Sequence, residues 1–213
     1  RKVIEAHLKE LERLGATLID VELPRLDDGE QLEVLLTELK AALPQYLKKR
    51  RPEAAVKSLA DVIAFNEKNA DREMPFFGQD LLVLAEGKGP LGNPHYKKAL
   101  EAGRKAARKE GIDLAVAKHK LDALVTGAME PAWLLDPVLG DAVGVASGYG
   151  HAAVAGYPSI TVPAGLVGGL PVGLLFFGAA YTEAALLRVA YAYEQGTQAR
   201  TLPTYAATAT PKF

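Results

Sequence analysis

The sequence predicts an α/β protein, and two observations lead to that prediction. A helical pattern over residues 3–14 ends at Gly15, a typical helix stop, and an alternating stretch at 17–23 follows it as a strand and ends at Pro24. In the second half of the chain, where charge becomes sparse, short apolar runs are bounded by Gly or Pro. These runs are residues 123–126, 159–162 and 172–177. Such runs are typical of strands buried on both faces, and helices that alternate with strands indicate the α/β class.

The region between these parts is predicted to be mainly helical. Residues 32–43 have helical spacing, and we expect a break or bend at Pro44 because proline lacks the backbone donor. Ser58 followed by Asp61 resembles a capping box that opens the next helix. Asn93-Pro94 reads as a cap followed by proline at the first helical position.

Two further segments complete the predicted elements. Residues 74–92 are rich in Phe, Gly and Pro, so we expect a loop or short helices there. Thr182 is expected to cap a last helix that continues through Tyr193. The Thr/Pro/Ala-rich stretch from Thr201 is expected to be loose.

Composition excludes several classes of function. The chain has 213 residues, a formal net charge of −1 and no cysteine, so disulfides, thiolate metal sites and cysteine nucleophiles are excluded. Without a concentrated basic face, neither nucleic acid nor a membrane surface is expected as a partner. No run is long and apolar enough to span a bilayer. The chain enters a helix directly at Arg1, as if it were part of something longer, and the compartment stays open.

Three motifs that suggest chemistry have simpler interpretations. Residues 87–92 match G-x-G-x-x-G, but a helical stretch precedes them, whereas a dinucleotide site needs a strand there, so a surface loop is predicted. Asp141, Ser147 and His151 contain the residue types of a hydrolytic triad, yet all lie in one glycine-rich stretch, so polar loop residues are the favoured interpretation. The four histidines have no metal-binding spacing, and no metal site is predicted.

Four residues are candidates for contact with a substrate. Trp133 comes shortly after a predicted strand, where ligands tend to bind in α/β proteins, and Asp136 is close by; packing of the ring and capping of a turn are the alternatives. Phe77 and Gln79 stand in the irregular region, and a Gln side chain can both donate to and accept from an amide. The alternative for this pair is that Phe76 and Phe77 anchor the loop while Gln79 caps the following helix.

An ordered set of Gly- and Pro-rich blocks gives a more specific indication. They are Asp-Ala-Leu-Val-Thr at 122–126, Gly-Tyr-Pro-Ser-Ile-Thr-Val-Pro-Ala-Gly at 156–165, Gly-Leu-Pro-Val-Gly at 169–173, Phe-Gly at 177–178 and the helix at 183–194. In order and spacing the blocks resemble the C-terminal portion of the amidase-signature family, and the resemblance covers nearly the whole chain. Ala-Phe-Asn at 64–66 and Phe-Gly-Gln at 77–79 resemble the subgroup that contains peptide amidases.

The resemblance implies a fold and a chemistry. The family fold is an α/β/α sandwich around a large twisted mixed sheet, and residues 1–213 would be the C-terminal portion of one such domain. The family hydrolyses amides through a Ser–cis-Ser–Lys triad, in which a neutral Lys is the base, and it needs no cofactor. The Gly/Ser-rich signature that carries those residues does not occur in this sequence. No residue here inherits a catalytic role, and the chain alone is predicted to be inactive.

Three functions follow from this interpretation. The first is the C-terminal part of an amide hydrolase, with small amides or peptide C-terminal amides as substrate and the missing N-terminal half as partner. The second is a non-enzymatic amidase-like scaffold or partner-binding module. The third is the amidotransferase subunit that passes ammonia to a tRNA-bound acid, which ranks below the hydrolase because no strongly basic surface is predicted.

Overall fold

The structure is a computed structural model that describes residues 2–134, 136–141 and 148–205. The chain divides into two compact units, one formed by residues 1–26 and 104–213 and the other by residues 27–103. Each unit has a hydrophobic core of its own. Within the described ranges, no helix has the length and apolarity that crossing a membrane requires.

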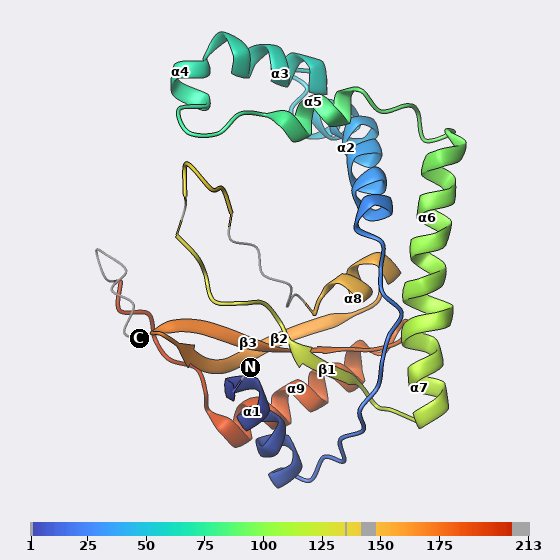
Figure 1. Cartoon of the computed structure of the whole chain (residues 1–213), viewed down its shortest axis with the longest axis vertical. Helices are drawn as coiled ribbons and strands as arrows, with labels where there is room; N and C mark the ends of the chain where they lie inside the picture. The colour runs from blue at the N-terminus through green and yellow to red at the C-terminus, as the bar shows by residue number, and fades with distance from the viewer. Residues whose placement is uncertain (1, 135, 142–147, 206–213) are drawn as a thin grey trace. The chain divides into compact units, whose positions relative to one another are not determined.

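A three-stranded antiparallel sheet forms the centre of the first unit (Figure 1). Its strands are β1 (Leu124–Gly127), β2 (Ser159–Val167) and β3 (Leu170–Phe177), in the order β1-β3-β2. Four successive side chains of β3, residues 174–177, are buried, although side chains alternate between the faces of a strand. Both faces of β3 are therefore covered, as the apolar runs predict, and the strands predicted from the three apolar runs are confirmed.

Helices cover the two faces of this sheet. They are α1 (Lys2–Arg13), the π-helical turn η1 (Arg108–Ile112), α7 (Asp113–His119), α8 (Gly150–Ala155) and α9 (Glu183–Thr197). Leu174 and Phe176 pack in one core cluster with residues of α1 and α9. Leu175 and Phe177 pack in a second cluster with residues of η1, α7 and α8. Helix layers on both sides of a sheet confirm the α/β class (Figure 1).

The β2–β3 hairpin is shaped by glycines that adopt left-handed backbone angles. Gly168 and Gly169 have φ of 58° and 83°, and Val167 pairs with Leu170 across them. Two successive positive φ angles are typical of the tight turn that matches the twist of a hairpin. Gly165, with φ of 85°, lies where the β2–β3 register shifts, so it forms part of a β-bulge.

The first helix ends as predicted, but the strand expected after it does not form. Gly15 has φ of 98°, the Ala16 N–H donates to the Leu11 carbonyl at 3.0 Å and the Gly15 N–H donates to that of Glu12 at 2.9 Å, which is a Schellman ending. The prediction of a strand at residues 17–23 is wrong. No described strand lies beside them, and their apolar side chains instead pack separately against the two core clusters.

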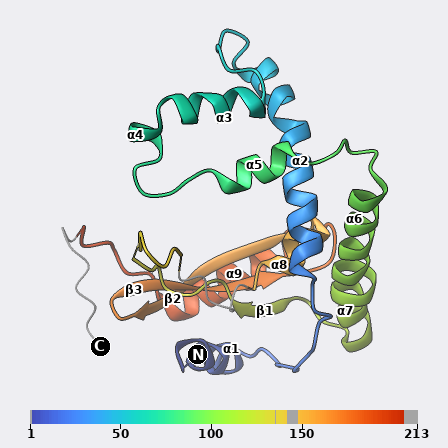
Figure 2. The same cartoon turned by 45° about the horizontal axis from the view of Figure 1, so that its top comes forward.

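The second unit is helical (Figure 2). Its elements are α2 (Asp28–Arg50), α3 (Leu59–Lys68), α4 (Ala70–Glu73), α5 (Asp80–Glu86) and α6 (Pro94–Ala107), whose last residues belong to the other unit. Leu36, Leu59 and Ala85, from α2, α3 and α5, are buried together and form its core. The capping box of α3 is confirmed: the Asp61 N–H donates to Ser58 Oγ at 3.1 Å and the Ser58 N–H donates to the Asp61 carboxylate at 3.0 Å.

A break or bend was expected at Pro44. The break does not occur, because helix α2 continues through Pro44 to Arg50. Proline inside a helix removes one hydrogen bond, so other interactions must hold the segment. The helix starts with the Glu30 N–H donating to Asp27 Oδ1 at 2.8 Å and ends with the Arg51 N–H donating to the Leu47 carbonyl at 2.8 Å. Packing of α2 in the core of the unit, together with these caps, offsets the lost bond.

Gly173 provides a test of how tightly the sheet is packed. A Cβ at this position would lie 2.4 Å from Thr161 Cγ2 and 3.4 Å from Ala128 Cβ. The Cγ2 methyl is on a stiff β-branched side chain, so we expect Gly173→Ala to lower the free energy of unfolding by about 1–3 kcal/mol. Chemical denaturation measures this loss. Thr161→Ser removes the methyl and is expected to recover most of it; equal losses in both backgrounds would contradict the steric cause.

Candidate functional site

Trp133 and Asp136 both lie in the segment that follows β1, and both make local hydrogen bonds. Trp133 Nε1 donates to Asp141 Oδ1 at 3.2 Å. Asp136 Oδ1 accepts the backbone N–H groups of Val138 at 2.8 Å and Leu139 at 2.9 Å, which makes an Asx turn. The N–H groups of Leu139 and Val138 hold the pKa of Asp136 below its ordinary value. Asp136 thus caps a turn and stays ionised, while its contact with substrate remains a prediction.

Gln79 and Phe77 lie in the helical unit. Gln79 occupies the N-cap position of α5, but its side chain makes no capping bond, so the expected cap is wrong in that respect. Its Nε2 donates to the Ile63 carbonyl at 3.1 Å and its Oε1 accepts from Asn66 Nδ2 at 3.0 Å. The side chain therefore joins the loop to α3, because both of these partners belong to that helix. One N–H and one lone pair of the amide remain for another partner.

The two phenylalanines of this loop are not buried anchors. Phe76 is 66% exposed and Phe77 is 41% exposed. This exposure does not support the alternative in which both rings anchor the loop, and the hydrogen bonds of Gln79 join the loop to α3 instead. Of the four candidates, Phe77 and Gln79 share the helical unit, and Trp133 and Asp136 share the other.

The triad-like residues do not assemble as a catalytic set within the described part of the chain. Asp141 accepts from Trp133, and His151 Nε2 lies 2.7 Å from the Pro24 carbonyl oxygen. Because a carbonyl only accepts, His151 Nε2 carries the proton and ties α8 to the N-terminal segment. Ser147 lies outside the described residues.

The other histidines have structural surroundings as well. His7 Nδ1 lies 2.7 Å from the Tyr193 hydroxyl, and the two rings meet edge to face. Burial raises the pKa of Tyr193 to about 12, so the hydroxyl stays protonated. Across the described ranges, no three His, Asp or Glu side chains are grouped as a metal ion would require.

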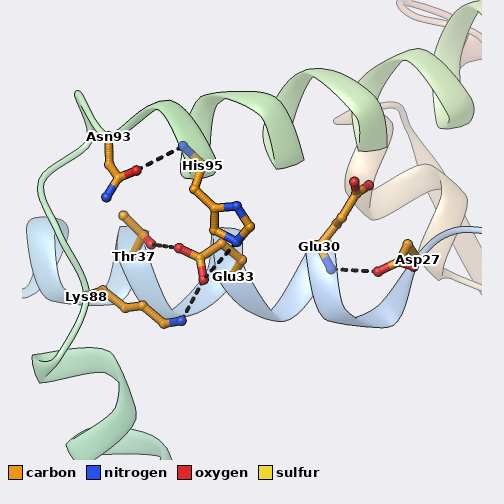
Figure 3. Close-up of polar contacts among 7 residues, drawn as sticks. All are labelled: Asp27, Glu30, Glu33, Thr37, Lys88, Asn93 and His95. Carbon is orange, nitrogen blue, oxygen red and sulfur yellow. Dashed lines mark hydrogen bonds and ion pairs between the residues drawn. The ribbon is translucent and has the colours of Figure 1, made fainter.

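A cluster of polar side chains around Glu33 on α2 was not predicted from the sequence (Figure 3). The Lys88 ammonium lies 2.5 Å from Glu33 Oε2, Thr37 Oγ1 donates to Oε1 at 3.3 Å, and His95 Nε2 lies 4.0 Å away. The Glu33 side chain is only 13% exposed. Its hydrogen bond to Lys88, above all, lowers the pKa of Glu33, so the carboxylate stays charged.

The G-x-G-x-x-G stretch, residues 87–92, contributes Lys88 to this cluster. Residues 87–92 form a loop between α5 and α6, as predicted, and not a strand-to-helix turn. Lys88 supplies its ammonium to Glu33, while Lys40 on α2 donates to the carbonyls of Glu86 and Lys88. The loop is therefore fastened to α2 by two lysines. The only local signal was the Glu33–Thr37 spacing on one helix face; the partner Lys88 is 55 residues away.

The family model described as Amidase matches residues 1–187 of this chain. A probable amidase of Arabidopsis thaliana is 35% identical over 96% of the chain and 38% of its own length. A glutamyl-tRNA(Gln) amidotransferase subunit of Ralstonia pickettii is 30% identical over 92% of the chain and 41% of its own length.

A similar solved structure is the native peptide amidase from Stenotrophomonas maltophilia. It is 45% identical, with a TM-score of 0.85, over 96% of this chain and 41% of that chain. The chain thus spans about two fifths of the length of the relatives it matches.

Replacing Gln79 tests the connection between its loop and α3. Gln79→Leu removes both side-chain bonds and leaves the Ile63 carbonyl without this partner, so the free energy of unfolding should fall by about 1–3 kcal/mol. Gln45→Leu is the matched control, because Gln45 donates to the Ala41 carbonyl at an exposed position. Thermal or urea unfolding compares the two. A loss no larger than that of the control would contradict the role of Gln79.

Replacing Lys88 tests the charge of Glu33. In Lys88→Met the pKa of Glu33 should rise, since its main stabilising partner is gone. A lowered folded-state pKa stabilises the fold above the unfolded-state value, and this contribution disappears as pH falls through the folded-state pKa. The stability advantage of the wild type should therefore be full at neutral pH and vanish in acid. NMR titration of the Glu33 carboxyl and unfolding at several pH values measure both effects; Lys97→Met, at an exposed position, should alter neither.

Proposed function

This chain belongs to the amidase family, and we propose that it forms the C-terminal part of an amide hydrolase that cleaves carboxamide C–N bonds. The similarity to the peptide amidase, 45% identity at a TM-score of 0.85, is the observation that carries this proposal. It favours peptide C-terminal amides as the substrate class.

The Asn66–Gln79 hydrogen bond is a second observation that supports the proposed relation to peptide amidases. The two short motifs that resemble that subgroup, residues 64–66 and 77–79, lie on different elements, one on α3 and the other in the loop before α5. The 3.0 Å bond between their amide side chains makes them one structural feature. The feature leaves Phe77 exposed beside it, as a side chain that contacts the apolar part of a peptide should be.

The chemistry we propose is that of the family. A serine attacks the amide carbonyl, a second serine in a cis peptide relays the proton, and a neutral lysine acts as base. As the family resemblance implies, these residues would lie on polypeptide N-terminal to this chain, and the reaction would need no metal or organic cofactor. Phe77, Gln79, Trp133 and Asp136 are the residues through which this chain would contact the substrate.

Exposed apolar side chains support a polypeptide partner, which we propose is the N-terminal half. On α5, Leu81, Val83 and Leu84 are 52–57% exposed, and beyond β1 Val138 and Leu139 are 84–89% exposed. Clustered apolar surface of this kind usually marks an interface. The relatives are more than twice as long as this chain, so the remaining part of such a protein is the natural occupant.

Two specific observations favour alternatives. Relatives that belong to a glutamyl-tRNA(Gln) amidotransferase support an ammonia-transferring function, but the net charge of −1 gives no support for a tRNA partner. The described residues contain no catalytic set, and this is compatible with a non-enzymatic scaffold as well as with one part of a hydrolase. Salt-dependent binding of tRNA would favour the first alternative, and assembly without hydrolysis the second.

Complementation tests the proposal. The chain alone should release no ammonia from a dipeptide amide, whereas co-expression with the part of the Stenotrophomonas maltophilia peptide amidase that this chain does not match should restore release. The measurement is ammonia release. The control is the same pair with the reactive serine of the co-expressed part replaced by alanine. Hydrolysis by the chain alone that disappears in Ser147→Ala would overturn the assignment of roles.

A further inference from the structure

A cavity of about 460 Å³ opens in the sheet-containing unit, and none of the four candidate substrate contacts is among its lining residues. Its lining residues are Arg108, Gly156, Tyr157, Pro158, Ala180, Tyr181 and Glu183. The Gly178 N–H donates to the Pro158 carbonyl at 3.3 Å, so the cavity is at the end of the sheet where β2 begins and β3 ends. β1 also begins at this end, because Leu124 pairs with Phe177. The segment with Trp133 leaves from the opposite end of β1.

Two contacts position the Arg108 side chain in the wall of this cavity. Its Nε donates to the Ala155 carbonyl at 2.7 Å, and its guanidinium lies 5.6 Å from the centre of the Tyr157 ring. The Tyr157 hydroxyl donates in turn to Asp113 at 3.0 Å. No other described side chain or carbonyl bonds the two terminal nitrogens of Arg108. A fixed guanidinium with four free N–H groups is thus presented to the cavity.

Backbone irregularities surround the same cavity. Arg108 starts the π-helical turn η1, and a Cβ on Gly111 would lie 2.5 Å from the Ala106 carbonyl oxygen, so the turn requires glycine there. Tyr181 has φ of 63° and is 94% exposed. Isolated π turns and left-handed non-glycine residues are found at functional sites more often than elsewhere, because they cost stability.

The charges of the lining determine which ligand fits. A planar guanidinium matches a carboxylate through two parallel hydrogen bonds. Among the described lining residues Arg108 is the only cation, so it balances one negative charge and not the two of a phosphate. Glu183, in the first turn of α9, gives the cavity an exposed carboxylate that attracts an ammonium group. A ligand with one carboxylate and one ammonium group satisfies both side chains.

We propose that this cavity binds a free amino acid or short peptide, with the ligand carboxylate on Arg108 and its ammonium group at Glu183. The volume lies in the range of small-molecule sites. A carboxamide is neutral and offers Arg108 a weaker acceptor, so the site distinguishes an acid from its amide. The inference stands independently of the proposed function, since it needs no hydrolysis.

Titration of the 213-residue chain with leucine, leucinamide and N-acetylleucine tests the site, by calorimetry and by backbone amide shifts in NMR. Leucine should bind at least about tenfold more tightly than leucinamide and shift the amides of Gly156, Tyr157 and Tyr181. Equal affinity for leucine and leucinamide, or leucine shifts confined to other residues, would overturn the proposal. This comparison uses the wild type only, so it holds even if a variant fails to fold.

Variants separate the two ends of the ligand. Arg108→Gln should abolish leucine binding, whereas Arg104→Gln, at an exposed position four residues earlier on α6, should leave it unchanged. Glu183→Gln should weaken leucine binding several-fold and leave the affinity for N-acetylleucine, which has no ammonium group, unchanged. Leucine binding that survives in a folded Arg108→Gln protein would contradict the assignment.

Discussion

Burial of the central strand β3 on both faces is the constraint on which the sheet-containing unit depends. Leu174 and Phe176 need one apolar layer and Leu175 and Phe177 another, and each such side chain contributes roughly 1.5–3 kcal/mol when it is removed from water. Because both layers are required, residues from α1 at one end of the sequence and α9 at the other must meet on one face. The tight glycines, such as Gly173, follow from the same packing.

Hydrogen bonding of polar side chains organises the helical unit in a comparable way. Glu33 is mostly removed from water, and its charge is tolerated because Lys88 and Thr37 bond it directly. Gln79 uses its amide in the same manner to fix a loop on α3. These bonds join the loops that flank α5 to the neighbouring helices α2 and α3.

Side chains that suggest chemistry in the sequence are used here first for structure. Asp136 closes a turn, His151 ties α8 to Pro24, and Gln79 fastens a loop. Asp136 and Gln79 each keep hydrogen-bonding capacity that these contacts do not use. The cavity around Arg108 lies at the end of the sheet where β1 begins, whereas the segment with Trp133 leaves from the other end of β1. The described residues hold no assembled catalytic set, and the chain covers about two fifths of the length of the relatives it matches.

The sequence by itself determined the features that depend on neighbouring residues: the helix stop at Gly15, the Ser58 capping box, the buried strands and the family. It failed at residues 17–23, where an alternating pattern matched a strand but no neighbouring strand was present to pair with it among the described residues. It also did not reveal Glu33 with Lys88, or Arg108 with Tyr157 and Glu183. Only the tertiary structure decided these, because local patterns record backbone preference and burial, while a polar pair or a cavity depends on which distant segments the packing of the core brings together.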